Sequence, residues 1–234
     1  MPSNWSKGQT KETNLSVKKI SDTMKLRKID NFKVWREKMK LEGKIRSVYP
    51  SFTKNGDLAE LMGVVLGDGH ISKFPRSEEL TIFSNSSNKG FIKRYSKLVE
   101  KFFNKVPYVA KTSWSNCVRI RIYQKHISQR LGVPFSPRKN KKISVPRWIL
   151  SNKGYVARYL RGLYEAEGSF CVHLPTSTYK FMFSNKNTSM LGNVFRLMKV
   201  LGFHPHWTKA NYNIQISRKA EVYQAIKLLQ FRIY

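Results

Sequence analysis

The chain has 234 residues, of which 41% are hydrophobic and 13% aromatic, so it can bury a substantial core and is not a disordered protein. Its 44 Lys and Arg residues against 14 acids give a formal net charge of +30, which favours nucleic acid over anionic membrane as the partner. No apolar run is long enough for a membrane span, no secretory signal is visible, and Cys117 and Cys171 lack metal-ligand spacing. These features predict a soluble, intracellular protein in a reducing compartment, either bacterial cytoplasm or an organelle matrix.

Residues 1–56 are interpreted as a basic N-terminal arm. They contain 14 Lys and Arg residues against 5 acids, a net charge of +9. Two short amphipathic helices are expected, each with one apolar stripe that can bury little by itself. The stripe residues at helical spacing are Val17, Ile20 and Met24, followed by Phe32, Trp35 and Met39.

Residues 57–133 form a first half that begins with the phrase "LMGVVLGDG", Leu61–Gly69, typical of a helix stopped by glycine. Two strands, "HISKF" and "ELTIFS", should follow, and then a helix. Its apolar face contains Phe91, Tyr95, Leu98 and Phe102. The strands "YVAKTSW" and "CVRIRIYQ" and a short helix over about 126–131 complete the half.

Residues 134–153 are proline-punctuated and basic, and we expect a linker there. Residues 154–234 then repeat the order of the first half, starting from "LRGLYEAEG", Leu160–Gly168. The acids Asp68 and Glu167 of the two phrases are 99 positions apart. Two repeats are too few for a solenoid, so the pattern indicates a pseudo-dimer within one chain.

Small residues occur four positions apart in both phrases, as Gly63 and Gly67 and as Gly162 and Ala166. This spacing leaves one helix face without bulky side chains and lets two helices pack closely. The carboxylates that follow would then lie near each other and repel unless a cation intervenes. Mg²⁺ prefers oxygen ligands, waters and phosphates.

A basic protein with such a site is equipped to hydrolyse phosphodiesters. A lone "GDG" is usually only a turn. Two matched copies favour a site, because only three acids follow Lys101 and two of them belong to the second phrase.

The paired phrases and the element order resemble the single-chain LAGLIDADG homing endonucleases, over about residues 57–234. The resemblance implies an α+β fold with two αββαββα halves, whose antiparallel sheets form a DNA-binding saddle and which pack through the two motif helices. It also implies a monomeric nuclease that cuts both strands of a long asymmetric DNA target and serves intron or intein mobility. Two or three Mg²⁺ ions would be shared between the sites and bound by Asp68 and Glu167. Leu66 departs from the family phrase, at a position that is not a metal ligand; Glu165 is its counterpart.

Further site residues follow from the same resemblance. Polar residues after the second strand of each half would order the attacking water: Asn85 and Lys89, then Asn185 and Ser189. A basic residue near the end of each half would assist catalysis. Lys139 is the first choice, with Lys141 and Lys142 as rivals, and Arg232 is the late candidate in the second half.

The arm has a resemblance of its own. The stretch "NWSKGQTKET" followed by "VKKISDTMK" is similar to a nuclease-associated modular DNA-binding motif. An ordinary solvated basic tail is the alternative for this region.

Alternation within the strands predicts which side chains would read DNA, because a two-stranded ribbon fits the major groove. Outward positions should hold Arg119, Arg121 and Tyr123 in the first half and Asn213, Gln215 and Ser217 in the second, with Ser72, Arg76 and His173 from the first strands. Arginine pairs with guanine, and Asn or Gln with adenine. Because the two sets differ, the target should be asymmetric.

Two other functions of the same fold stay open: an RNA maturase that helps an intron fold, and a DNA-binding protein with an inactive site. Acids at both Asp68 and Glu167 argue against the inactive site and are neutral on the maturase.

Overall fold

The computed structural model describes residues 6–44, 48–208 and 212–234. The chain divides into two compact units, Met1–Tyr49 and Pro50–Tyr234. Within the described residues, none of the helices is both long and apolar enough to span a bilayer.

The N-terminal unit contains two helices, α1 (Leu15–Leu26) and α2 (Lys33–Leu41). The side chain of Asn14 caps α1 by accepting hydrogen bonds from the backbone N–H groups of Ser16 and Val17. Neither helix buries a residue, in agreement with the two predicted amphipathic segments. The first residues of the DNA-binding-motif resemblance, Asn4 and Trp5, lie outside the described residues.

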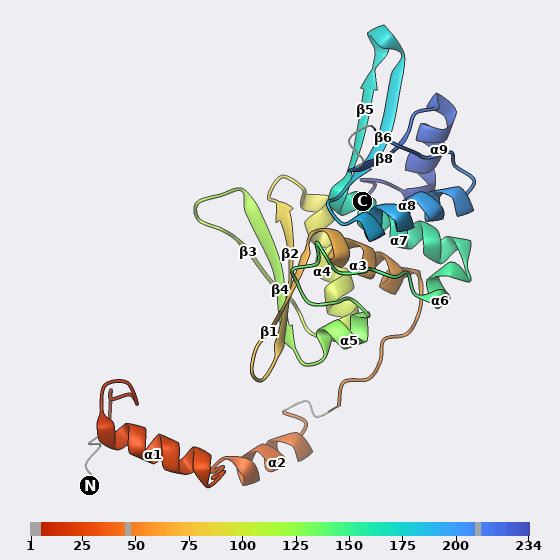
Figure 1. Ribbon diagram of the computed structural model, residues 1–234. Coiled ribbons are helices and arrows are strands. Elements are labelled where there is room, and N and C mark those ends of the chain that lie inside the picture. The colour runs from red at the N-terminus through yellow and green to blue at the C-terminus, as the bar shows by residue number, and fades with distance from the viewer. Residues whose placement is uncertain (1–5, 45–47, 209–211) are drawn as a thin grey trace. The chain divides into compact units, whose positions relative to one another are not determined.

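The second unit contains two halves with the predicted order of elements (Figure 1). The first half comprises α3 (Gly56–Gly67), β1 (Gly69–Lys73), β2 (Glu78–Asn85), α4 (Lys89–Phe103), β3 (Tyr108–Lys111), β4 (Cys117–Gln124) and α5 (Ile127–Leu131). After the short helix α6 (Arg147–Leu150), the second half comprises α7 (Lys153–Glu167), β5 (Gly168–His173), the 3₁₀ turn η1 (Leu174–Thr176), β6 (Thr178–Ser184), α8 (Thr188–Val200), β7 (His206–Trp207), β8 (Asn213–Ile216) and α9 (Lys219–Leu229).

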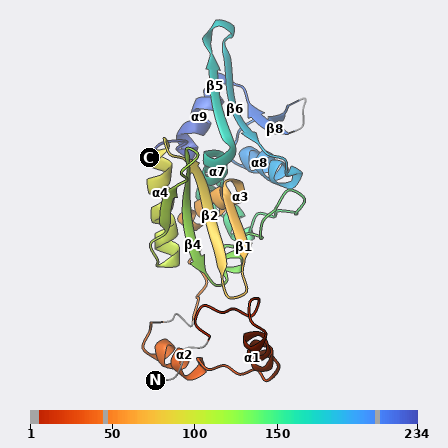
Figure 2. The same cartoon turned by 90° about the vertical axis from the view of Figure 1, so that its left-hand side faces the viewer.

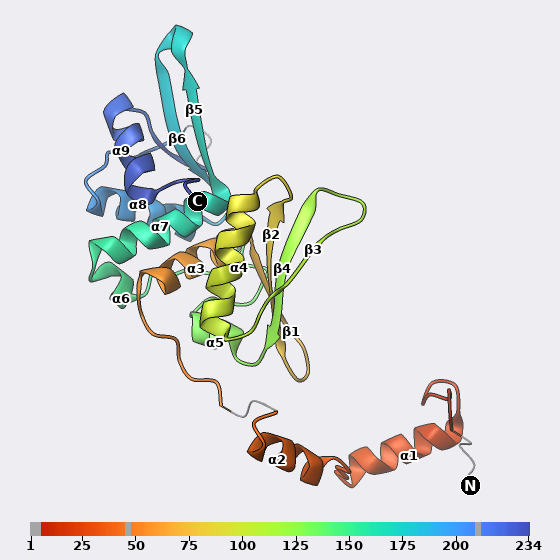
Figure 3. The same ribbon diagram turned by 180° about the vertical axis from the view of Figure 1, so that it is seen from behind.

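Each half has one four-stranded antiparallel sheet, in the orders β1-β2-β4-β3 and β5-β6-β8-β7. Helices cover one face of each sheet; α4 crosses the first sheet in Figure 3, and the opposite faces of both sheets are turned to the viewer in Figure 2. Alternate strand residues face the helices and are buried. They include Ile120 and Ile122 on β4 and Ile214 and Ile216 on β8. The predicted α+β fold with two pseudo-symmetric halves is confirmed.

The second unit starts at Pro50, before the residue at which sequence reading begins the first half. Phe52 lies against the rings of Phe102 and Phe103, with centroid distances of 5.4 and 5.1 Å, and under the guanidinium of Arg130 at 4.0 Å. These contacts tie the segment before α3 to the second unit.

The segment between the halves is held to both of them. On the first half, the Ser136 N–H donates to the Ile71 carbonyl of β1 at 3.1 Å. On the second half, the Asn187 side chain donates to the Arg138 and Lys141 carbonyls at 2.7 and 2.8 Å, and Asn193 donates to the Ile143 carbonyl at 2.8 Å. The expected linker, residues 134–153, is therefore ordered by contacts with both halves, and we call it the strap.

Candidate active site and nucleic-acid interface

The two motif helices, α3 and α7, touch through their backbones. A Cβ placed on Gly63 would lie 2.3 Å from the Tyr159 carbonyl oxygen, and one on Gly162 would lie 2.1 Å from the Glu60 carbonyl oxygen. A Cβ on Gly67 would lie 2.4 Å from the Cβ of Ala166. The small residues at four-residue spacing thus face each other, which confirms the predicted close packing.

This packing brings the helix ends together. Asp68 is the C-cap of α3, and Glu167 is the last residue of α7. The glycine after each acid lets the chain turn directly into a strand: a Cβ on Gly69 would lie 2.5 Å from the Val65 carbonyl oxygen, and one on Gly168 would lie 2.4 Å from that of Tyr164. Each carboxylate is therefore fixed where a helix meets the first strand of its sheet.

Both carboxylates are half-buried, in surroundings that disfavour their ionised forms. Burial, together with the nearby negative charge of Glu167, raises the pKa of Asp68 to about 7. Burial also raises the pKa of Glu167, although a hydrogen bond from Asn185 opposes the rise. The site consequently disfavours two negative charges until a cation or another positive group neutralises them.

The predicted water-ordering residues differ between the halves. The Asn185 amide donates to Glu167 Oε1 at 3.2 Å, and its own Oδ1 accepts from the Asn187 N–H at 2.8 Å, so Asn185 orients the carboxylate. Asn85, at the matching place, instead accepts from the N–H and Oγ of Ser87, both at 3.0 Å. Lys89 is exposed at the first turn of α4.

Ser189 is engaged by the strap. Its hydroxyl accepts from the Ile143 N–H at 2.9 Å and contacts Asn187 Oδ1 at 2.6 Å. In this arrangement Ser189 supports the junction between strap and α8.

The candidate basic residues also differ in their contacts. Lys139 and Lys142 are exposed, whereas Lys141 Nζ donates to the Phe135 carbonyl at 2.7 Å. Arg232 donates its backbone N–H to Glu165 Oε1 at 2.6 Å, and its guanidinium lies over the ring of Phe231 at 4.8 Å.

Arg138 was not predicted as a site residue. It is one of five Lys and Arg residues within 138–147, and the sequence gives no reason to single it out from this basic run. It is buried and donates to the carbonyls of Val65 and Gly69 at 3.0 and 2.8 Å, which caps the C-terminal end of α3. Burial lowers its pKa to about 10. Its Nη2 is buried without a hydrogen-bond partner in the described part of the chain.

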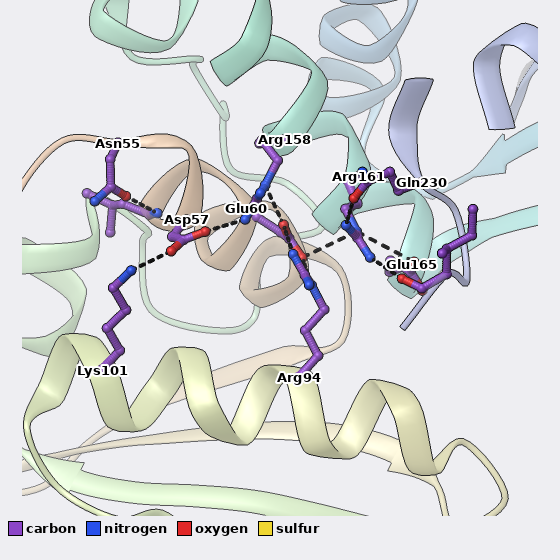
Figure 4. Close-up of polar contacts among 11 residues, drawn as sticks. Asn55, Asp57, Glu60, Arg94, Lys101, Arg158, Arg161, Glu165 and Gln230 are labelled. Atoms are coloured by element: carbon purple, nitrogen blue, oxygen red, sulfur yellow. Dashed lines mark hydrogen bonds and ion pairs between the residues drawn. The ribbon is translucent and has the colours of Figure 1, made fainter. Parts of the chain in front are cut away.

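A buried charge network lies where α3 and α7 approach α4 and the C-terminal residues (Figure 4). Glu60 is fully buried and binds Arg94 Nη2 at 2.9 Å, Arg158 Nε at 2.6 Å and Arg161 Nε at 3.5 Å. Arg161 also donates to Gln230 Oε1 and to the Ile233 carbonyl, both at 2.6 Å. The network ties both motif helices to each other, to α4 and to the end of the chain.

The predicted DNA-reading residues lie on the sheet faces that the helices leave open. On β4, Arg119, Arg121 and Tyr123 alternate with buried residues. Asn213 and Gln215 do the same on β8, and Gln215 donates to the hydroxyl of exposed Ser217 at 2.6 Å.

The remaining predicted DNA-reading residues lie on the first strand of a half or just after it. Ser72 is on β1, at the outward position opposite Glu79. Arg76 was expected on the first strand but lies in the turn between β1 and β2, because β1 ends at Lys73 and Pro75 follows shortly after it. His173 ends β5, where its Nδ1 lies 2.7 Å from the Thr176 hydroxyl.

Glu79 is a second residue that sequence reading missed. It faces outward on β2, and its Oε1 lies 3.0 Å from Arg121 Nε and accepts a hydrogen bond from the Thr81 hydroxyl at 2.7 Å. The alternation of "ELTIFS" could have placed Glu79 on this face, but not its partner on another strand.

Neither a protein-family model nor a curated protein matches this sequence. Solved structures do match its fold. Variants of the homing endonuclease I-DmoI superpose with a TM-score of 0.52 at 18% identity, over 74% of this chain and 94% of theirs. I-DmoI in complex with DNA and Mn superposes with a TM-score of 0.50 at 17% identity, over 74% of this chain and 96% of that chain.

A third structure, the N-terminal LAGLIDADG domain of DUF199/WhiA, gives a TM-score of 0.51 at 12% identity, over 77% of this chain and 86% of that domain. The chain has the LAGLIDADG homing endonuclease fold. Since the identities are low and one fold supports several functions, activity has to be argued from the site.

Proposed function

We propose that this protein is a metal-dependent endonuclease that cuts both strands of a long, asymmetric DNA target. The observation that carries the proposal is the placement of Asp68 and Glu167 at the adjoining ends of two backbone-packed helices, in a chain of net charge +30. Half-buried carboxylates with raised pKa values are unusual on a merely structural surface.

The donor set fits Mg²⁺. Asp68 and Glu167 would hold the ions, two or three of them shared between the sites, with waters and DNA phosphate oxygens as the remaining ligands. Bound there, divalent cations would stabilise the charge on the reacting phosphate and lower the pKa of a bound water. I-DmoI, which shares the fold, binds DNA and Mn, and this supports the assignment.

The residues of the chain itself have separate roles in this proposal. Asn185 orients Glu167, and Asn85 with Lys89 would order water beside Asp68. Of the basic candidates, Lys139 and Lys142 are free to approach DNA, whereas Lys141 is bound to a backbone carbonyl. Arg232 is the candidate for the second half.

The open sheet faces would hold the DNA, and their different side chains would make the target asymmetric. Arg119, Arg121 and Tyr123 come from the first half, while His173, Asn213, Gln215 and Ser217 come from the second. Ser72 and Arg76 extend the first set. The N-terminal unit, with α1 and α2, would add a DNA-binding arm, and the protein would act as a monomer in intron or intein mobility.

Selection from randomised duplexes, scored by cut ends in Mg²⁺, tests the proposal. Asp68→Asn and Glu167→Gln should each abolish cutting of both strands and keep DNA affinity in Ca²⁺, because the sheets are unchanged. Glu100→Gln, which removes one exposed acid from α4, should cut normally.

A folded Asp68→Asn protein that cut both strands at the normal rate would exclude the proposed metal site. A wild-type protein that bound its selected DNA without cutting would instead be a DNA-binding protein of this fold. Preferential binding to a structured intron RNA would indicate the maturase.

A further inference from the structure

Glu79 is an unexpected residue on the surface proposed to meet DNA. The strands of the first sheet all lie within the described residues, and Glu79 is the single carboxylate at their outward positions. The outward positions of the second sheet's strands, also described, carry none. An acid there would place a negative charge beside any bound DNA and weaken non-specific binding, so a compensating role is expected.

Glu79 is held in one position. The hydroxyl of Thr81, a residue only 3% exposed, donates to Oε1 at 2.7 Å, and the same oxygen lies 3.0 Å from Arg121 Nε. The Glu79 and Arg121 side chains are 16% and 26% exposed. Register explains the contact: Arg121 lies opposite Thr81, and Glu79 lies opposite Tyr123, so Glu79 and Arg121 are diagonal neighbours on adjacent strands.

The contact engages the inner nitrogen of the guanidinium. Arg121 Nε and Glu79 Oε1 form an ion pair at 3.0 Å without hydrogen-bond geometry, and no residue in the described part of the chain hydrogen-bonds to Nη1 or Nη2. These terminal groups are the ones that donate to O6 and N7 of guanine in the major groove. A guanidinium that is held beside a carboxylate by charge attraction loses less conformational freedom on binding a base and is drawn away from the phosphates.

We propose that Glu79 is a positioning residue for specificity: it orients Arg121 so that Arg121 reads guanine at one base pair of the target. This inference rests on the proposed DNA-binding function of the sheet. A purely structural role is the competing explanation, but an ion pair on a partly exposed sheet face contributes little to folding stability.

The test measures binding in Ca²⁺, where the DNA stays uncut. Wild-type protein first selects its target from randomised duplexes, and a panel of single base-pair changes in that target is then titrated with each variant. Arg121→Ala should flatten the preference at one base pair or two adjacent ones, with guanine as the preferred base there. Glu79→Gln keeps the size of the side chain and should reduce discrimination at the same base pair by at least about fivefold, within the range of one bidentate contact.

Three further readouts separate positioning from a structural or purely electrostatic effect. Affinity of Glu79→Gln for unrelated duplex DNA should equal or exceed that of wild type, since one repulsive charge is gone. The double variant Glu79→Gln/Arg121→Ala should discriminate no worse than Arg121→Ala alone, because both changes remove one function. Glu100→Gln, with the same change in net charge on a helix behind the sheet, should keep the wild-type preference.

Unchanged discrimination by Glu79→Gln would overturn the inference, as would a loss at a different base pair or a loss additive with that of Arg121→Ala. The inference also fails if Arg121→Ala flattens no position. A wild-type protein that selects no sequence would contradict the proposed function itself, which distinguishes the two failures.

Discussion

Gly63 on α3 and Gly162 on α7 lie directly against each other's helix, so closely that the Gly162 Cα would be 3.1 Å from a Cβ added to Gly63. The contact leaves no room for a side chain on either residue, because the nearest atoms are backbone atoms that cannot rotate away. It sets the distance between the helices and therefore the distance between the acids at their ends.

We expect Gly63→Ala and Gly162→Ala each to lower the free energy of unfolding by about 1–3 kcal/mol or more, because the added methyl group forces the helix backbones apart. Thermal and urea unfolding of the metal-free protein measure the loss. Gly192→Ala is the matched control: Gly192 is inside α8 and has nothing within 4 Å of an added Cβ, so alanine should stabilise by up to about 1 kcal/mol. Equal effects of the three changes would contradict backbone contact at the motif helices.

Asp68→Asn should change how stability depends on pH in metal-free buffer. The pKa of Asp68 is about 7 in the folded protein against an ordinary value of 3.8, so between these pH values the native state binds more protons than the unfolded chain. The contribution of Asp68 therefore lowers the stability of the wild-type protein as pH rises from about 4 to about 7. The Asn variant escapes this loss and should be about 1–3 kcal/mol more stable than wild type at pH 7.5 and equal to it near pH 4.

Asp57→Asn should change the folding stability in the opposite direction. Although burial raises the pKa of Asp57, the hydrogen bond from Lys101 and the charge of Arg158 outweigh it and hold the pKa below its ordinary value. Stability from Asp57 is present at neutral pH and is lost as pH falls through the folded pKa. Asp57→Asn should therefore destabilise by about 1 kcal/mol at pH 7.5. If Asp68→Asn destabilised the protein at pH 7.5 as Asp57→Asn does, the raised pKa of Asp68 would be refuted; if Asp57→Asn stabilised it, the lowered pKa of Asp57 would be.

Glu60→Gln should be strongly destabilising, since Arg94, Arg158 and buried Arg161 would lose the charge that they share. Leaving buried charge uncompensated costs roughly 3–5 kcal/mol. Chemical unfolding against the exposed Glu100→Gln control, expected within about 0.5 kcal/mol of wild type, measures the effect. A loss below that of the control would mean that the network adds nothing to the fold.

Deletion of residues 1–49 should leave the fold of the second unit intact, because α1 and α2 bury no residue. DNA affinity should fall, and the slope of log K against log salt should become shallower by about 0.9 for each lost phosphate contact. Binding titrations at several salt concentrations, with thermal unfolding as the check on folding, give both quantities. Unchanged slope and affinity would remove the arm from the DNA interface.

Local patterns in the sequence determined much of the fold. Alternation in "CVRIRIYQ" and "YNIQIS" separates buried isoleucines from outward polar residues, and glycine spacing in the paired phrases predicts the helix contact. These properties depend on periodicity and side-chain size within a few residues, which the sequence displays directly. The order of elements and the pairing of Asp68 with Glu167 follow from the same repeat.

Long-range packing, in contrast, determines which polar groups meet. Glu60 pairs with Arg94 and Arg158 on other helices, and Glu79 pairs with Arg121, which is two strands later in the chain. Arg138 of the strap donates hydrogen bonds to carbonyls at the end of α3. Periodicity reports that a residue is buried or faces outward, but a charged side chain in a chain with 44 Lys and Arg has many candidate partners. The choice among them is made by long-range packing of helices and strands, since an ion pair requires its two groups to lie within about 4 Å.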